Sequence, residues 1–344
     1  EGPKRDEITI KIAACGVCHS DLSATTGKIP YPPPLVLGHE AAGVVVEVGE
    51  GVTAFKEGDH VVSTFISMCG KCSQCARGRP VLCENARKAM FNLPDGTVRT
   101  KGADGEPLNV FGACGVMAEF ATMHVDNCVK VDETVPMQNA ALVGCAVMTG
   151  VGAVFNTAKL EPGSRAAVFG IGGVGLNAIQ GCVTAGAEMI VAVDSNPAKL
   201  AMAKEFGATH TVNINEVEDA AKAVKKMTGG VDYAFECVGA GPVVEQAYKS
   251  LGRGGTAVVV GVADPKDKTS LTTLTLPADE RTLKGSWLGS ARPQHDFPRI
   301  LGLYKAGKLK LDELVTRTYP IEDAVQAFDD MVAGKNARGV IVFE

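Results

Sequence analysis

The chain has 344 residues, more than one hydrophobic core usually serves, so we expect two domains. Hydrophobic residues make up 46% and charged residues 21%, and the net charge of -5 comes without a long run of one sign, which argues against a nucleic-acid partner. Two uncharged stretches, residues 134–158 and 166–187, contain polar residues or several glycines, so we expect buried elements and no membrane partner. Because the chain opens without a signal-peptide pattern, we expect a cytoplasmic protein.

The first part of the chain predicts a domain of short antiparallel strands. Alternating apolar runs bounded by turn residues occur at residues 8–13, 42–48 and 60–64. Residues 86–111 include three glycines and carry charges of both signs, so we expect a surface loop that is functional or part of an interface. The pattern favours a mainly β fold for this part.

Four of the eleven cysteines crowd into one short segment and predict a metal site. With spacings of two, two and seven residues, they can surround one tetrahedral ion; these cysteines are Cys69, Cys72, Cys75 and Cys83. A closed four-cysteine site is structural, because no coordination position stays open for a substrate. An iron–sulfur cluster is the alternative, but the fourth spacing fits neither common ferredoxin pattern. We therefore expect a structural zinc ion.

From about residue 147 the pattern changes to apolar strands that alternate with segments of helical length. The clearest strands are residues 166–169, 190–193, 231–235 and 256–261. This alternation is typical of a parallel, doubly wound α/β sheet. After Trp287 the pattern predicts helices at 295–306 and 321–333 and a strand at 339–343, whose sheet the pattern alone does not identify.

A glycine-rich turn at residues 170–175 carries the fingerprint of a dinucleotide site. Gly170, Gly172 and Gly175 follow the first of these strands and open an apolar helix. The first two glycines let the backbone turn beneath a pyrophosphate at the helix N-terminus, and the third lets helix and strand pack closely. Asp194, which ends the next strand, would bond the ribose hydroxyls and repel a 2′-phosphate, which favours NAD over NADP. The plainer alternatives are a turn that binds nothing and a helix N-cap at Asp194.

A second set of candidate metal ligands is scattered along the chain. Cys18 precedes a His-Ser-Asp run, His39 and Glu40 follow Gly38, and Cys145 lies far from both. Taken singly, each signal is weak, because a free cysteine is more often a small buried hydrophobe and a single histidine is more often structural. Together with the four-cysteine segment, the fingerprint and the C-terminal strand, these motifs resemble the zinc-dependent medium-chain dehydrogenase/reductase family. The resemblance covers nearly the whole chain and points to the alcohol dehydrogenase branch, similar to its class III members with a long loop.

The resemblance implies an α/β fold with two domains. A GroES-like, mainly β catalytic domain would take residues 1–146 and 288–344, with a structural-zinc lobe at 67–85. A Rossmann domain that binds NAD, with a doubly wound parallel sheet, would take residues 147–287. The family implies two zinc ions per chain, one of them structural and one catalytic.

The family's catalytic zinc ligands fall on Cys18, His39 and Cys145, which leaves a fourth position for water or substrate. Cys15 is an alternative to Cys18 as the zinc ligand, but the family motif places the ligand directly before the His-Ser-Asp run. The resemblance implies that Asp21 orients His39 and that Glu40 approaches the metal when water exchanges, although a buried ion pair would also explain Glu40.

Other roles also follow from the resemblance alone. Ser20 matches the hydroxyl that takes the alcohol proton, and its alternative is a helix N-cap. The implied cofactor contacts are His19, Thr149, Gly170, Gly172, Gly173, Val174, Gly175, Asp194, Lys199, Val262 and Arg338. The resemblance also puts Phe65, Phe111, Val262 and Trp287 near the substrate channel.

The chain departs from the family pattern at three places. Ser23 stands where many relatives carry a relay histidine, so we expect proton release through water or another group. The chain begins at Glu1 within what resembles the second strand of the family's catalytic domain, so we expect a leading hairpin to be missing. The proline-rich residues 29–34 alter the substrate channel relative to the glutathione-dependent formaldehyde branch.

The sequence therefore predicts a reversible, zinc-dependent oxidation of primary alcohols to aldehydes with NAD, and favours bulky, aromatic or allylic alcohols. The alternatives are a glutathione-dependent formaldehyde dehydrogenase, a polyol dehydrogenase, a zinc-free quinone reductase, with which the ligands conflict, and a non-catalytic zinc- and NAD-binding structural protein. Small alcohols and aldehydes are the expected partners. A homodimer is the first choice of assembly and a tetramer the second, because the family joins sheet edges across a two-fold axis.

Overall fold

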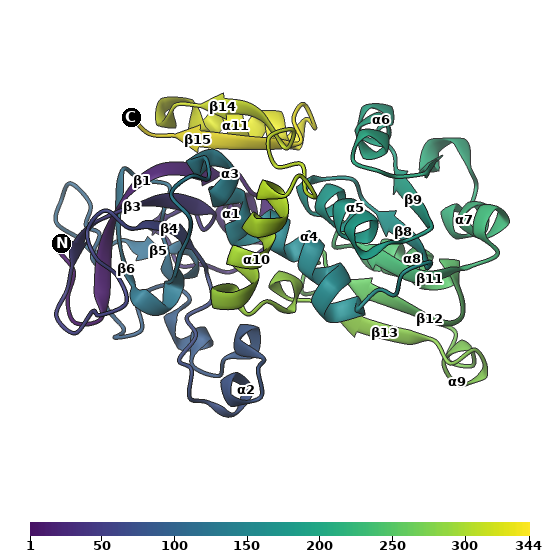
Figure 1. The fold of residues 1–344 in the computed structure, drawn as a ribbon, viewed down its shortest axis with the longest axis horizontal. Coiled ribbons are helices and arrows are strands. Elements are labelled where there is room, and N and C mark those ends of the chain that lie inside the picture. The colour runs from purple at the N-terminus through teal and green to yellow at the C-terminus, as the bar shows by residue number, and fades with distance from the viewer. The chain divides into compact units, whose positions relative to one another are not determined.

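The computed structural model describes residues 1–344, without the side chains of residues 87 and 88. The chain divides into two compact units, one made of residues 1–145 and 292–344 and the other of residues 146–291. The two boundaries lie one and four residues from those expected from the sequence. Both units combine helices with strands, so the expected α/β class is confirmed (Figure 1).

The first unit is built on a seven-stranded, largely antiparallel sheet. Its strands run in the order β14-β15-β1-β3-β4-β7, and β6 also pairs with β1. Their bounds are β1 Glu7–Gly16, β3 Ala41–Val48, β4 His60–Ser63, β6 Phe120–His124, β7 Cys128–Lys130, β14 Val315–Tyr319 and β15 Arg338–Val342. A second, two-stranded sheet joins β2 Leu35–Val36 and β5 Asn109–Val110. The C-terminal strand that pattern could not place thus pairs with β1 on one side and β14 on the other.

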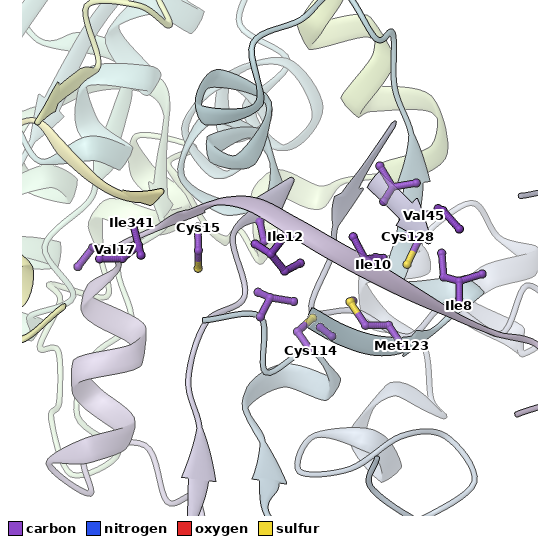
Figure 2. Packing of buried hydrophobic residues seen from close by; sticks show 14 of the residues in the cluster. Ile8, Ile10, Ile12, Cys15, Val17, Val45, Cys114, Met123, Cys128 and Ile341 are labelled. Atoms are coloured by element: carbon purple, nitrogen blue, oxygen red, sulfur yellow. The ribbon is translucent and has the colours of Figure 1, made fainter. Parts of the chain in front are cut away.

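Strand β1 shows why this sheet forms. Ile8, Ile10 and Ile12 alternate with more polar residues, and each is at most 1% exposed. An alternation of period two buries one face of a strand, and here that face meets Met123 and Cys128 from other strands (Figure 2). The core of the first unit therefore lies beneath β1.

Two helices near the C-terminus, α10 Pro293–Lys305 and α11 Ala324–Val332, are the longest of the first unit. The others are α1 His19–Thr25, α2 Ser73–Ala76, η1 Pro80–Leu82, η2 Ala86–Ala89, η3 Phe111–Ala113, η4 Val125–Asn127, α3 Met137–Leu142 and η9 Ile321–Asp323. The continuous helix Met137–Ala158 passes from the first unit to the second through η5 Val143–Val147, α4 Met148–Gly152 and η6 Ala153–Ala158. By length and composition this helix could cross a membrane, but 83% of its most apolar window is buried, as in a core helix.

The second unit is a six-stranded parallel sheet in the order β10-β9-β8-β11-β12-β13. Its strands are β8 Arg165–Phe169, β9 Met189–Asp194, β10 His210–Asn213, β11 Val231–Glu236, β12 Leu251–Val259 and β13 Thr282–Gly285. Its other helices are α5 Gly173–Ala185, α6 Pro197–Glu205, η7 Ile214–Glu216, α7 Ala220–Thr228, α8 Gly241–Ser250, α9 Thr275–Ala278 and η8 Leu288–Ser290. The strand order reverses between β8 and β11, and ligands of such sheets bind at the carboxyl ends of the strands at this point.

The segment 86–111 is less superficial than the sequence suggested. Arg99 is only 4% exposed, and its Nε donates to a Glu7 carboxylate oxygen at 2.8 Å. A second guanidinium nitrogen donates to Asp95 at 2.7 Å, and Leu93 is buried as well. Most of the described segment is exposed or half-exposed, as expected of a surface loop, but a buried ion pair fastens it to β1.

Candidate functional site

Four potential ligand residues from distant parts of the first unit meet at one point. Cys18, His39, Glu40 and Cys145 each offer an atom, and these atoms all lie within 4.8 Å of one another. All four residues are buried. Two thiols, an imidazole and a carboxylate are a donor set that suits zinc, so the residues fit the metal that the sequence predicts.

Local structure explains how these residues converge. Cys18 is the N-cap of α1, at the point where the chain leaves β1. His39 and Glu40 directly precede β3, which pairs with β1, and Cys145 lies in η5. Cys15, the rival of Cys18, packs instead in the hydrophobic core beneath β1 (Figure 2).

Asp21 lies one turn beyond Cys18 and faces His39. Its carboxylate oxygens are 3.2 and 3.3 Å from the histidine Nδ1, and one of them also accepts a hydrogen bond from the Gly38 backbone N–H at 2.8 Å. A carboxylate at Nδ1 fixes the ring so that Nε2 points away from it, toward the other donors. The structure thus gives Asp21 the geometry of an orienting residue.

Glu40 forms a buried ion pair, which the sequence left open as the alternative to an approach of Glu40 to the metal. Its Oε2 accepts from an Arg338 guanidinium nitrogen at 2.6 Å, although the two residues are 298 positions apart. A Cβ at Gly16 would lie 2.7 Å from the same Glu40 oxygen, so glycine leaves room for the pair. Among the described residues, Glu40 Oε1 has no hydrogen-bond partner, and it lies 3.9 Å from His39 Nε2. Glu40 therefore has one oxygen held by Arg338 and one directed at the ligand cluster.

Burial and neighbouring charges shift the pKa values of this cluster in different directions. Burial raises the pKa of Glu40 to about 8, although the Arg338 charge opposes the shift. The hydrogen bond with Cys145 lowers the pKa of the Cys18 thiol well below its usual value, with help from His39. For His39, burial works to lower the pKa, but the Asp21 carboxylate outweighs it and the pKa rises. At this site Glu40 and His39 therefore hold a proton more readily than in water, whereas Cys18 loses its proton more readily.

Two aromatic rings, Phe65 and Phe111, lie against the candidate ligand His39. Phe65 meets the imidazole edge to face at 5.4 Å between centroids, and Phe111 lies at 5.0 Å. Tyr31 stacks on Phe111 at 4.6 Å and contacts Phe91 at 4.9 Å. The sequence predicted Phe65 and Phe111 near the channel, but it did not single out Tyr31 or Phe91, whose positions depend on tertiary contacts.

The four cysteines at residues 69–83 form a second cluster, in which three residues are half-exposed and Cys83 is buried. Their sulfur atoms also lie within 4.8 Å of one another; the residues are Cys69, Cys72, Cys75 and Cys83. Backbone N–H groups of Cys72 and Cys75 donate to the sulfurs of Cys69 and Cys72 at 3.4 and 3.5 Å. Backbone donors, led by that of Lys71, lower the pKa of Cys69 to about 6. Such donors stabilise thiolates, so this cluster fits a closed tetrahedral zinc site.

The glycine-rich turn of the second unit has the form that a dinucleotide needs. Gly172 is exposed and caps the N-terminus of α5, and a Cβ built there meets no atom within 4 Å. A Cβ at Gly175 would lie 2.0 Å from the Gly170 carbonyl oxygen, so only glycine lets α5 pack this closely. Gly173 and Val174 form the first turn of α5. The open helix N-terminus fits a pyrophosphate.

Asp194 stands at the carboxyl end of β9, next to that turn. One carboxylate oxygen accepts from the Ile171 backbone N–H at 2.7 Å and the other from Asn196 N–H at 2.9 Å. The N-cap of α6 is Asn196, so the alternative role of Asp194 as that cap is not what the structure shows. The carboxylate is half-exposed beside the glycine-rich turn.

The other predicted site residues belong to one unit or the other. In the first unit, His19 and Ser20 are the first two residues of α1, and Arg338 begins β15. The remaining residues lie in the second unit: Thr149 in α4, Lys199 in α6, and Val262 and Trp287, which are 43% and 45% exposed. The structure thus brings together the predicted zinc ligands within the first unit and the predicted phosphate-binding turn with Asp194 within the second.

Comparison with known proteins covers both units. Residues 4–133 match the alcohol dehydrogenase GroES-like domain, and residues 173–306 match the zinc-binding dehydrogenase family. The chain is 40% identical to alcohol dehydrogenase class-3 of Cereibacter sphaeroides and 38% identical to S-(hydroxymethyl)glutathione dehydrogenase of Paracoccus denitrificans, in each case over 100% of this chain and 94% of the relative. The solved structure of benzyl alcohol dehydrogenase from Acinetobacter calcoaceticus matches with a TM-score of 0.92 and 33% identity, over 100% of this chain and 94% of that one.

Proposed function

Since the chain belongs to the zinc-binding alcohol dehydrogenases, we propose that it oxidises primary alcohols reversibly to aldehydes with NAD as the hydride acceptor. The observation that carries this proposal is the meeting of Cys18, His39 and Cys145 beside Glu40. Three strong ligands leave a position for substrate, which a closed four-cysteine site does not. We expect two zinc ions per chain, one in each cluster.

The chemistry follows from this arrangement. Bound zinc supplies a Lewis acid that lowers the pKa of the alcohol hydroxyl, and bound NAD supplies the hydride acceptor. Asp21 holds the His39 ring in the orientation that the site requires. Ser20, half-buried in the first turn of α1, is the proposed acceptor of the alcohol proton, and His19 and Arg338 are the proposed phosphate contacts from the same unit.

The preference for NAD rests on Asp194. A carboxylate at the end of the second strand of such a sheet accepts hydrogen bonds from the ribose hydroxyls and repels the 2′-phosphate of NADP. Its position beside Ile171 and the open Gly172 supports this role. Lys199, Thr149, Val174 and Val262 are the further proposed contacts of the cofactor in this unit.

Aromatic and allylic alcohols are the proposed substrates. The rings of Phe65 and Phe111 lie directly beside the candidate zinc ligand His39, and Tyr31 stacks behind Phe111. An aromatic wall favours a flat, apolar substrate by offset or edge-to-face contact, worth about 0.5–1.5 kcal/mol per ring pair. The likeness to a benzyl alcohol dehydrogenase supports the same substrate class. Trp287 of the second unit is the third proposed aromatic residue of the channel.

A glutathione adduct of formaldehyde is the second candidate substrate, because one relative is an S-(hydroxymethyl)glutathione dehydrogenase. A panel of benzyl, allyl and short aliphatic alcohols, a polyol, and formaldehyde with and without glutathione separates these proposals. Each is assayed with NAD and with NADP. We expect the highest kcat/KM for benzylic or allylic alcohols with NAD. A rate with formaldehyde that depends on glutathione and exceeds the others would favour the second candidate.

We also propose a cytoplasmic homodimer, with a tetramer as the second choice. Strand β13 ends the parallel sheet, and its Leu283 is 39% exposed. An open strand edge with an apolar side chain is suited to pairing with a second copy across a two-fold axis. Light scattering at micromolar concentration tests this proposal, which a monomer would contradict.

A further inference from the structure

Glu236 ends β11 at the point where the strand order of the parallel sheet reverses. It pairs in register with Phe169 at the end of β8 on one side and with Val259 at the end of β12 on the other. The glycine-rich turn begins directly after Phe169. Glu236 therefore lies at the carboxyl edge of the sheet, where a doubly wound fold binds its ligand.

The Glu236 carboxylate is buried, and the hydrogen bonds that hold it within the described part of the chain come from backbone groups. The residue is 1% exposed, and its Oε1 accepts from the N–H groups of Val238 and Gly239 at 2.8 and 2.7 Å. Among the described residues, its Oε2 has no hydrogen-bond partner. Burial raises the pKa of Glu236, although the backbone donors oppose the shift. Burial of a carboxylate is costly unless hydrogen bonds or an opposite charge compensate for it, so its two bonds to the turn after β11 are important for its stability.

That turn lies between two segments that carry proposed cofactor contacts. On one side, a Cβ at Gly170 would lie 2.5 Å from a Val238 methyl carbon. On the other side, a Cβ at Gly239, where φ is +81°, would lie 2.5 Å from the Val262 carbonyl oxygen. The Glu236 carbonyl also accepts from Gly261 N–H at 3.0 Å. A shift of the turn would therefore displace the glycine-rich turn, the segment of Val262, or both.

We infer that Glu236 is a positioning residue for the dinucleotide: its carboxylate holds residues 237–239 between the glycine-rich turn and the segment of Val262, and so sets the distance between these two segments. Glu236 does not itself touch the cofactor. The inference rests on the proposed function, because it assumes that a nicotinamide dinucleotide binds at this edge.

The test is a fluorescence titration of NADH and NADPH against the purified, zinc-loaded enzyme and its variants. Glu236→Ala should raise the Kd for NADH about tenfold or more, because two backbone N–H groups lose a charged acceptor. Glu236→Gln should stay within about threefold of wild type, because the amide oxygen can accept both hydrogen bonds. In steady-state kinetics, the KM for NAD should rise in Glu236→Ala while the KM for the alcohol stays unchanged.

Asp232→Asn is the matched control, because Asp232 lies near the opposite end of the same strand and pairs with Arg165 at 3.2 Å. It should leave the Kd for NADH unchanged even if it lowers the melting temperature. If Glu236→Ala does not fold, Glu236→Asp serves, because its shorter side chain should still raise the Kd about threefold.

An NADH affinity equal to that of wild type in the folded Ala or Asp variant would overturn the inference. So would a Gln variant as weak as the Ala variant, since rescue by the amide is specific to the proposed hydrogen bonds. A wild-type enzyme that binds NADPH and not NADH would contradict the proposed cofactor alone, and Glu236 would then be judged with NADPH. A wild type that binds neither would overturn both proposals.

Discussion

Two sulfur-rich clusters in the first unit are built in opposite ways. The four cysteines of the lobe all come from residues 69–83, around the short helix α2, and three of the four are half-exposed. The donors of the other cluster come from Cys18, His39 and Cys145, and meet only because β1, β3 and η5 pack together. One cluster is local in the chain and the other depends on the whole fold of the unit.

Whether the ligands are local or distant in the chain distinguishes a metal site that stabilises the fold from one that can bind a substrate. A local set of four thiolates closes around an ion and leaves no free position, so its metal can only stabilise the segment. A set of three ligands on a rigid core keeps a position for substrate, and its surroundings can be shaped for chemistry. Removal of a ligand should therefore reduce stability in the first cluster and turnover in the second.

The largest expected effect is on turnover, in the buried cluster. His39→Ala should lower kcat/KM at least about a thousandfold, because Lewis-acid stabilisation is worth several kcal/mol. Circular dichroism and thermal unfolding should show a folded protein. The matched control is Cys15→Ala, which removes a buried thiol three residues from Cys18 and should cost only about 1 kcal/mol of stability, with activity kept. Strong residual activity in His39→Ala would contradict the claim that the buried cluster carries turnover.

The second effect is on stability, in the lobe. Cys72→Ser should lower the free energy of unfolding by about 4 kcal/mol or more, because the bound metal contributes to folding. Activity per folded molecule should fall far less than in His39→Ala. Ser73→Ala, at an exposed neighbouring position in α2, is the control and should be close to neutral. Chemical unfolding followed by fluorescence measures both, and an unchanged unfolding curve for Cys72→Ser would contradict the structural role.

The third effect concerns Asp21, whose substitution tests whether zinc binding at the buried cluster depends on the carboxylate that faces His39. Asp21→Asn keeps the shape and an acceptor for Gly38 but loses the charge that faces His39, so zinc affinity or activity should fall about 10- to 100-fold. Asp59→Asn is the matched control: Asp59 is also a buried acid of this unit, but it pairs with Lys130. Competition with a chelator measures zinc affinity. Equal zinc affinity in wild type and Asp21→Asn, at equal activity, would show that the contact is only structural.

The smallest expected effect concerns Ser23, in the middle of α1. Its half-buried side chain stands at the family's relay-histidine position and cannot accept a proton near neutral pH as an imidazole can. Ser23→His should raise single-turnover hydride transfer at pH 7 by about threefold, and by less at pH 9, where other acceptors compete. Stopped-flow absorbance of NADH measures the step directly. A variant no faster than wild type at pH 7 would mean that Ser23 does not mark a missing relay.

The sequence predicted the features that are encoded locally. The glycine-rich turn, the four-cysteine lobe and most strands follow from spacing and periodicity, because each lies within a short stretch of chain. For the second cluster, Cys18, His39 and Cys145 could be selected only through the resemblance to a family. Their convergence depends on strand pairing that no local pattern specifies.

What the sequence missed depends on contacts between distant residues. The sequence allowed a buried ion pair at Glu40 but not its partner Arg338, which lies 298 positions away, and the ion pair of Arg99 with Glu7 spans 92 positions. Burial of Arg99 could not be predicted from a segment of mixed charge, because the sequence does not show whether an arginine is paired and buried or exposed. Tyr31 and Phe91 were missed for the same reason, since their rings meet only after residues 29–34 fold against the loop.

The most direct test of the account is elemental analysis of zinc in the wild type and in two single variants. The two clusters predict about two zinc ions per wild-type chain, and about one in each of Cys18→Ser and Cys72→Ser. The Cys18→Ser protein should be stable and inactive, whereas the Cys72→Ser protein should be active when folded but unstable. Iron in place of zinc, or one metal or fewer in carefully prepared wild-type protein, would contradict the assignment of one closed and one open zinc site.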